Sequence, residues 1–171
     1  MYNELVKRKG VTNVMIDGYA ISMGSLIAMA GKNSGGKTTM AKNALMMVHK
    51  PLSEMRGNAD DFRKQAELLD KVEDALISPY VEATGKSKEE IKEMLAETTW
   101  MTAEEALTHG FITDISEKET AVNACFSKTF INENKSKFGN IPESFINQFI
   151  VAEKVEPVVP VVPVVPVVPV E

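Results

Sequence analysis

The sequence predicts a layered α/β domain, and three observations lead to this fold class. Two short apolar runs, VTNVMID (residues 11–17) and GFITDI (110–115), have the composition of buried strands. A third run, ALMMV (44–48), is ambiguous between strand and helix. Segments with helix signals lie between the first and the last of these runs, and strands that alternate with helices indicate an α/β architecture.

The predicted helices begin and end at capping residues. The longest one runs from the N-cap Asn58 to Gly85 and has apolar side chains at helical spacing: Phe62, Ala66, Leu69, Val72, Leu76 and Tyr80. The segment SKEEIKEML opens with the capping box Ser87–Glu90. The segment TAEEALTHG opens with the capping box Thr102–Glu105 and ends at Gly110.

The composition fits one globular domain. The chain has 171 residues, of which 44% are hydrophobic and 25% are charged, and this length corresponds to about one domain. A net charge of -5 argues against nucleic-acid binding, which needs a clustered basic surface. The apolar runs are too short for a membrane span, so no membrane association is expected.

The compartment is predicted from the start of the chain and from its cysteine content. The first residues, MYNELVKRKG, lack the apolar core of a secretion signal. The single cysteine, Cys125, excludes an internal disulfide and fits a reducing compartment. We therefore expect a cytoplasmic protein, and no motif leads us to expect a metal or an organic cofactor.

The chain divides into three parts. Residues 1–116 form the predicted domain, residues 117–150 a C-terminal extension, and residues 151–171 a tail in which proline recurs at every third position. Such a repeat favours an extended polyproline or disordered conformation, since proline cannot donate a backbone hydrogen bond. The start, half a helix with Tyr2, Leu5 and Val6, leads directly into a strand, and we expect part of a larger α/β domain upstream.

One serine has the surroundings of a nucleophile. In DGYAISMGSLIAMAG (residues 17–31), Ser22 lies between Ala20 and Gly24 at a tight turn before a short apolar helix. A hydroxyl at a helix N-terminus is close to free N–H groups, including that of Met23, which favour a developing oxyanion. The pattern alone is also that of an ordinary helix start rich in small residues.

A nucleophilic serine needs a base, and the chain offers two histidines. His49 follows the apolar run 44–48 and precedes Lys50 and Pro51, so it lies at the exposed end of a buried segment. His109 lies in the C-cap of a predicted helix, where a solvated histidine is the ordinary case. The pattern leaves His49 open between a loop residue and a catalytic base.

A family resemblance joins these motifs. GYAISMGSLIAMAG, NALMMVHKP, GNADDF, ATGKSKEEIKEML and TWMTAEEALTHGFITDI resemble, in this order, segments of the ClpP-type serine peptidases. They are most similar to the ClpP-like head maturation proteases of tailed phages. The resemblance covers roughly residues 11–115, and more weakly KSKFGNIPESF (135–145). It implies a ClpP/crotonase-like fold, N-terminally truncated, in which the helix after Asn58 is a protruding handle.

The resemblance also implies an activity. Ser22 would be the nucleophile, His49 the base and Met23 an oxyanion donor of an ATP-independent serine endopeptidase. Its partners would be protein substrates, namely capsid or scaffold proteins cleaved during phage head maturation, and copies of itself in a homo-oligomeric ring. An alternative is a catalytically impaired module that keeps the fold for assembly.

The third member of the triad is open. The family places an acid two residues before the aromatic residue of TWMTAEEA, where this chain has Thr98. An acid is needed to orient the imidazole and to stabilise its cation. We therefore favour Glu97 over Thr98 and over Asp114. The family's upstream Asn-Ser-x-Gly-Gly loop has no counterpart before Ser22, which predicts weaker oxyanion binding.

A glycine-rich segment suggests a different function. GKNSGGKT (Gly31–Thr38) matches the phosphate-binding loop of nucleotide hydrolases. Such a loop needs a buried strand before Gly31 and a helix from Lys37, but residues 25–30 have helical composition. We interpret the match as a coincidence and expect Gly31–Lys42 to be a loop between the serine helix and the histidine strand.

Overall fold

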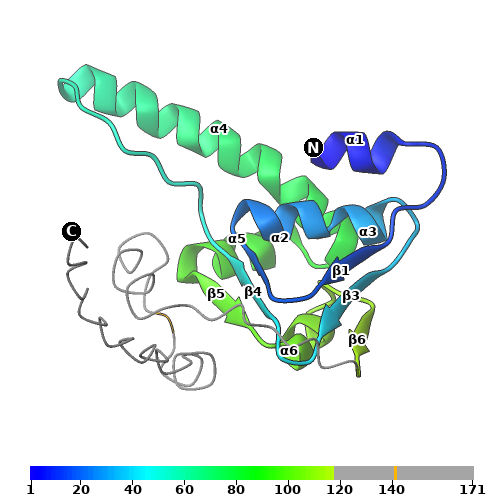
Figure 1. Cartoon of the computed structure of the whole chain (residues 1–171). Helices are drawn as coiled ribbons and strands as arrows, with labels where there is room; N and C mark the ends of the chain where they lie inside the picture. Colours follow the sequence, from blue (N-terminus) through cyan, green and yellow to red (C-terminus); the bar gives the residue numbers. More distant parts are fainter. Residues whose placement is uncertain (118–140, 142–171) are drawn as a thin grey trace, which may run out of the picture.

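The computed structural model describes residues 1–117 and Ile141. Helices and strands alternate along this part of the chain (Figure 1). The helices are α1 (Tyr2–Lys7), α2 (Met23–Ala28), α3 (Ala30–Asn33), α4 (Ala59–Thr84), α5 (Lys88–Glu97) and α6 (Ala103–Thr108). The strands are β1 (Val14–Ile16), β2 (Tyr19–Ile21), β3 (Thr38–Ala41), β4 (Leu45–Val48), β5 (Thr99–Met101) and β6 (Asp114–Ser116). The predicted α/β class is thus confirmed.

The strands form two three-stranded sheets. The first sheet has the order β1-β3-β6 and is parallel throughout. The second has the order β2-β4-β5, in which β2 and β4 are parallel and β5 is antiparallel to β4. Because β1 is followed directly by β2, and β3 by β4, the chain twice passes from the first sheet into the second.

Several predicted elements are confirmed and others were missed. The runs 11–17, 44–48 and 110–115 contain β1, β4 and the start of β6. Strands β2, β3 and β5 were not predicted. The predicted loop Gly31–Lys42 is wrong in part: it contains most of α3 and all of β3.

Helix α4 begins and ends where the caps predict. The Asn58 side chain accepts hydrogen bonds from the backbone of Asp60 and Asp61, and Gly85 closes the helix in the left-handed conformation at φ 74°. Helices α5 and α6 begin with the predicted capping boxes at Ser87 and Thr102. Local sequence therefore fixes these three helices well.

Only the C-terminal half of α4 packs against the body of the domain. Its buried residues are Glu73, Ile77, Tyr80 and Ala83, whereas Phe62 and Leu68 are about half exposed, at 52% and 51%. Figure 1 shows the N-terminal half of α4 projecting away from the sheets. This is the geometry expected of the handle helix.

The core lies between the sheets and the helices that cover them. It is rich in methionine and alanine, and its fully buried members include Met29, Met40, Met46 and Phe111. Helix α2 packs against β2, β4 and the C-terminal half of α4. The start of α2, where Ser22 lies, is therefore surrounded by fixed elements. The predicted extension (117–150) and tail (151–171) lie outside the described residues, except for Glu117 and Ile141.

Candidate active site

The parallel pairing of β2 and β4 brings the predicted serine and histidine together. Both strands end at the same edge of the sheet, with Ile21 opposite Met47. Ser22 follows β2 directly and His49 follows β4 directly. Side chains that follow neighbouring parallel strands meet at the carboxyl edge of a sheet, which is where ligands bind in many α/β proteins.

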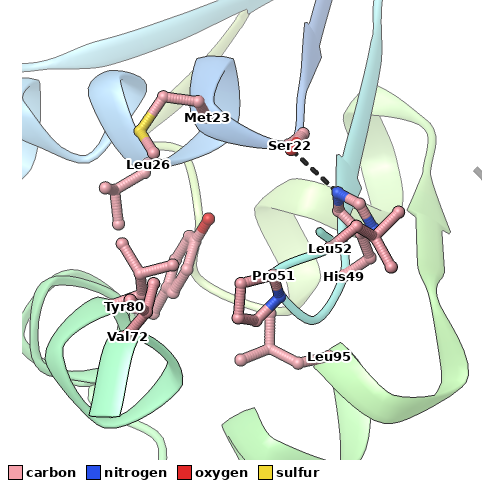
Figure 2. Close-up of a pocket in the computed structure, with 10 residues that line it drawn as sticks. Ser22, Met23, Leu26, His49, Pro51, Leu52, Val72, Tyr80 and Leu95 are labelled. Atoms are coloured by element: carbon pink, nitrogen blue, oxygen red, sulfur yellow. Dashed lines mark hydrogen bonds between the residues drawn. The ribbon is translucent and has the colours of Figure 1, made fainter. Parts of the chain in front are cut away.

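Ser22 and His49 are in direct hydrogen-bond contact. Ser22 Oγ lies 2.8 Å from His49 Nε2, as Figure 2 shows. The Ser22 N–H donates to the carbonyl of Met47, two residues before His49, at 3.0 Å. The backbone hydrogen bond fixes the two segments relative to each other, and the side chains lie within the distance needed for proton transfer.

The backbone of Ser22 is strained. Its dihedral angles, φ 57° and ψ -120°, lie outside the regions that side chains with a Cβ normally occupy. Strain of this kind costs about 1–3 kcal/mol and persists when the surroundings fix it. Here it produces the sharp turn from β2 into α2 that directs the hydroxyl toward His49, as in strand-to-helix turns that carry nucleophilic serines.

His49 is half-buried at the mouth of the site, and burial lowers the pKa of its imidazole below the ordinary value of 6.5. A lowered pKa keeps the ring neutral at neutral pH, as a general base requires. The following residue holds this segment in place: Lys50 N–H donates to the Leu95 carbonyl at 3.1 Å. The Lys50 ammonium also pairs at 3.4 Å with Glu73, a buried carboxylate of α4.

The Met23 N–H is available as an oxyanion donor. It belongs to the first turn of α2, whose N–H groups have no acceptor within the helix. No residue in the described part of the chain accepts a hydrogen bond from it. This geometry is consistent with the role predicted for Met23.

An apolar cavity of about 310 Å³ opens beside Ser22 and His49. Its walls come from α2, α4, the end of α5 and the segment after His49 (Figure 2). Its other lining residues are Met23, Leu26, Pro51, Leu52, Val72, Leu76, Tyr80 and Leu95. Apart from the serine, the histidine and the Tyr80 hydroxyl, these side chains are apolar, so the cavity suits an apolar side chain.

The predicted third member is not joined to His49. Glu97, the last residue of α5, is exposed, and among the described residues no hydrogen bond or ion pair links it to the imidazole. The antiparallel register pairs Val48 with Thr99, and one step further places Thr98 opposite His49. Asp114 lies in the other sheet and pairs with Lys37 at 3.3 Å. The role of Glu97 stays a prediction.

Two polar residues behind Ser22 were missed in the sequence. Ser25 Oγ donates to the Ser22 carbonyl at 2.6 Å and lies 2.8 Å from the Tyr80 hydroxyl. Both residues are buried, Ser25 at 0% exposure and Tyr80 at 4%. The available signal was Ser25 itself, a hydroxyl residue between Gly24 and the apolar run LIAMA (residues 26–30). Its partner Tyr80, from a distant helix, gave no local signal.

The glycine-rich segment does not form a phosphate site. The Thr38 hydroxyl, which would bind magnesium in such a loop, is buried and donates to the Ala28 carbonyl at 2.9 Å. The N–H groups of Gly36 and Lys37 donate to Gly31 and Asn13, so they are not free for a phosphate. A strand, not a helix, follows Lys37. The glycines are explained by packing, because a Cβ at Gly31 or Gly36 would overlap neighbouring backbone.

The described residues show neither a metal-binding cluster nor a membrane-spanning helix. Within residues 1–117 and Ile141, no cluster of three or more His, Cys, Asp or Glu side chains could hold a metal ion. Among the helices described, none combines the length and the apolar character that crossing a bilayer requires.

A serine hydroxyl bonded to an imidazole at a strained strand-to-helix turn, with a free N–H beside it, is the arrangement of a serine hydrolase. Comparison with known proteins identifies the particular group. The family model described as Clp protease matches residues 1–119. The chain therefore belongs to the Clp protease family, and its fold is that of this family.

Two relatives carry the name ATP-dependent Clp protease proteolytic subunit 1. The protein from Protochlamydia amoebophila (strain UWE25) is 36% identical over 100 residues, which are 57% of this chain and 48% of that subunit. The protein from Leifsonia xyli subsp. xyli (strain CTCB07) is 36% identical over 105 residues, 61% of this chain and 52% of the subunit. The chain thus spans about half the length of the curated relatives it matches.

Proposed function

We propose that this chain acts as a serine endopeptidase of the Clp type, with Ser22 as nucleophile and His49 as general base. The observation that carries the proposal is the 2.8 Å contact between Ser22 Oγ and His49 Nε2 beside an apolar cavity. His49 takes the Ser22 proton as the hydroxyl oxygen attacks the scissile carbonyl. The Met23 N–H donates to the oxyanion of the tetrahedral intermediate.

The second half of the reaction uses the same groups. The His49 cation gives its proton to the leaving amine, which leaves an acyl-enzyme on Ser22. A water molecule, deprotonated by His49, then attacks the acyl carbon and releases the acid product. The cavity beside Ser22 would hold an apolar side chain of the substrate, since the surface it offers is almost entirely hydrocarbon.

Our proposal for the biological substrate rests on the resemblance of the sequence to phage head maturation proteases. We propose that the chain cleaves capsid or scaffold proteins in the cytoplasm of an infected cell, as part of a homo-oligomeric ring. The half-exposed Phe62 and Leu68 on the projecting half of α4 support such an assembly, because they leave apolar surface unpaired. Cleavage would need no nucleotide on this chain, since the groups of the glycine-rich segment are engaged within the protein.

Peptide hydrolysis tests the proposal. A fluorogenic peptide with a large apolar residue before the scissile bond should be cleaved, and Ser22→Ala and His49→Gln should each abolish turnover. His109→Gln is the matched control: His109 is the chain's other histidine, it caps α6, and its loss should leave the rate unchanged. Equal cleavage by Ser22→Ala and wild type would refute the assignment.

A non-catalytic assembly module is the second candidate. The observation in its favour is that Glu97, the acid predicted from the sequence, is exposed and, among the described residues, forms no hydrogen bond or ion pair with His49. Sedimentation of the full chain distinguishes the two: ring-sized particles without any Ser22-dependent turnover would favour the assembly module, whereas turnover that Ser22→Ala abolishes would exclude it.

A further inference from the structure

A chain of buried hydrogen bonds runs from the handle helix to the backbone of the candidate nucleophile. Tyr80, in the buried half of α4, lies 2.8 Å from Ser25 Oγ, and Ser25 Oγ lies 2.6 Å from the Ser22 carbonyl oxygen. Figure 2 shows the Tyr80 ring at the wall of the cavity, opposite α2. The link joins two elements 55 residues apart in sequence.

The direction of each proton in this chain is determined. A carbonyl oxygen only accepts, so the single proton of the Ser25 hydroxyl is donated to Ser22. Ser25 Oγ then has only lone pairs to offer, and the Tyr80 hydroxyl must be the donor in the second bond. Burial raises the pKa of Tyr80 to about 12, so the phenol keeps this proton across the pH range of ordinary assays.

The Ser22 carbonyl receives more donors than an ordinary helix-start carbonyl. Besides Ser25 Oγ at 2.6 Å, it accepts from the N–H of Ser25 at 3.0 Å and of Leu26 at 3.4 Å. The hydroxyl contact is the shortest of the three. These bonds fix the plane of the peptide group that joins Ser22 to Met23.

That peptide group also carries the candidate oxyanion donor. In a planar trans peptide the C=O and the N–H point in opposite directions, so fixing the Ser22 carbonyl aims the Met23 N–H to the other side. Hydrogen bonds in a chain polarise one another, and a carbonyl that accepts strongly makes its own N–H a better donor. The orientation of the Met23 N–H and its strength as a hydrogen-bond donor thus depend on the groups that donate to the Ser22 carbonyl.

We propose that Tyr80 and Ser25 are positioning residues that orient and polarise the Ser22–Met23 peptide group for oxyanion binding. This inference rests on the function proposed above, because it assumes that the Met23 N–H binds the oxyanion. Neither residue touches the reacting atoms; both act through the Ser22 carbonyl. The handle helix thereby contributes to catalysis in addition to any part in assembly.

The test compares Tyr80→Phe, Ser25→Ala and the double variant with wild type. Tyr80→Phe keeps the ring that lines the cavity and removes only the hydroxyl. Thr38→Val is the matched control, because it removes an equally buried hydroxyl that donates to a backbone carbonyl, that of Ala28, away from Ser22. All four variants are made in the full chain.

The first readout is the amide resonance of Met23 in protein labelled with ¹⁵N-methionine. We expect it to shift upfield in Tyr80→Phe and further in Ser25→Ala, and to stay in place in Thr38→Val. This readout does not require activity. A Met23 resonance that stays at its wild-type position in both variants would overturn the inference.

The second readout is the reaction of Ser22 with a fluorophosphonate probe, whose phosphoryl oxygen occupies the oxyanion position. At saturating probe the rate should fall about fivefold in Ser25→Ala, the loss of one hydrogen bond, with little change in probe affinity. Tyr80→Phe should lower the rate less, and the double variant no further than Ser25→Ala, because the chain passes through Ser25.

The two proposals fail in different ways. A wild-type chain that never reacts with the probe refutes the proposed peptidase, while a shifted Met23 resonance would still support the positioning chain. A reactive wild type whose rate and Met23 resonance are unchanged by both variants refutes the positioning chain alone. A rate that falls equally in Thr38→Val would also refute it, since general destabilisation would then explain the loss.

Discussion

Replacing Ser22 by glycine and by alanine measures the strain stored at the nucleophile. Both variants lack the hydroxyl and its hydrogen bond to His49, so they differ only in the Cβ. At φ 57° and ψ -120° a residue with a Cβ carries about 1–3 kcal/mol of strain, which glycine does not. Glycine costs about 0.4–1 kcal/mol through the greater entropy of the unfolded chain. The Ser22→Gly variant should therefore be more stable than Ser22→Ala by about 0.5–2 kcal/mol.

Urea unfolding followed by circular dichroism tests this expectation. With a slope of about 1–3 kcal/mol per M for a small domain, the midpoint of Ser22→Gly should lie on the order of 0.5 M above that of Ser22→Ala. Ala96→Gly is the control: Ala96 is exposed within α5, where glycine should destabilise by about 1 kcal/mol. If glycine lowers stability at position 22 as it does at position 96, the backbone of Ser22 is not strained and the proposed turn is wrong.

Three further predictions follow from the site and its surroundings. Because burial lowers the pKa of His49, the peptidase rate should reach half its maximum below pH 6.5. The free energy of unfolding should fall as pH drops below about 6.5, because the unfolded state then binds a proton that the folded state does not. A half-maximal rate above pH 6.5, or the same slope of stability against pH in His49→Gln as in wild type, would contradict this. Thr98→Asp should raise the peptidase rate at least roughly tenfold, because it places an acid opposite His49 and aspartate tolerates the left-handed backbone better than threonine; an unchanged rate would contradict this. Glu97→Gln tests the role predicted for Glu97: a large loss of rate would support it as the orienting acid, and an unchanged rate would refute it. Gly36→Ala should destabilise the fold by about 1–3 kcal/mol, because its Cβ meets the Thr12 carbonyl, whereas Gly24→Ala, with open space around its Cβ, should not. Equal unfolding midpoints of the two variants in urea would contradict the packing explanation of Gly36.

Local signals predicted the helices and the candidate nucleophile better than the sheets. Capping residues such as Asn58 and Ser87 act within one turn of helix, so the sequence alone locates the helix ends. Strands have no such signal at their ends, and β2 is defined by its pairing with β4. The segment Gly31–Lys42 was misjudged for this reason: β3 is defined by its partners β1 and β6.

Contacts between distant segments explain what the sequence left open at the site. The pairing of Ser22 and His49 was foreseen because the segments that contain them, GYAISMG and NALMMVHKP, resemble motifs of one family. The role of Tyr80 was not foreseen, because its hydroxyl reaches Ser25 only once α4 packs against α2. Glu97 was favoured on chemistry, because an acid suits the imidazole, yet the turn at the end of α5 leaves its side chain exposed.

Reaction with a fluorophosphonate, followed by peptide mapping, tests the central claim most directly. The Ser22–His49 pair predicts that the phosphonate is found on Ser22 and not on Ser25, that Ser22→Ala abolishes labelling, and that His49→Gln slows it at least a hundredfold while His109→Gln does not. Labelling at another serine, or equal labelling of wild type and Ser22→Ala, would contradict the assignment of Ser22 as the nucleophile.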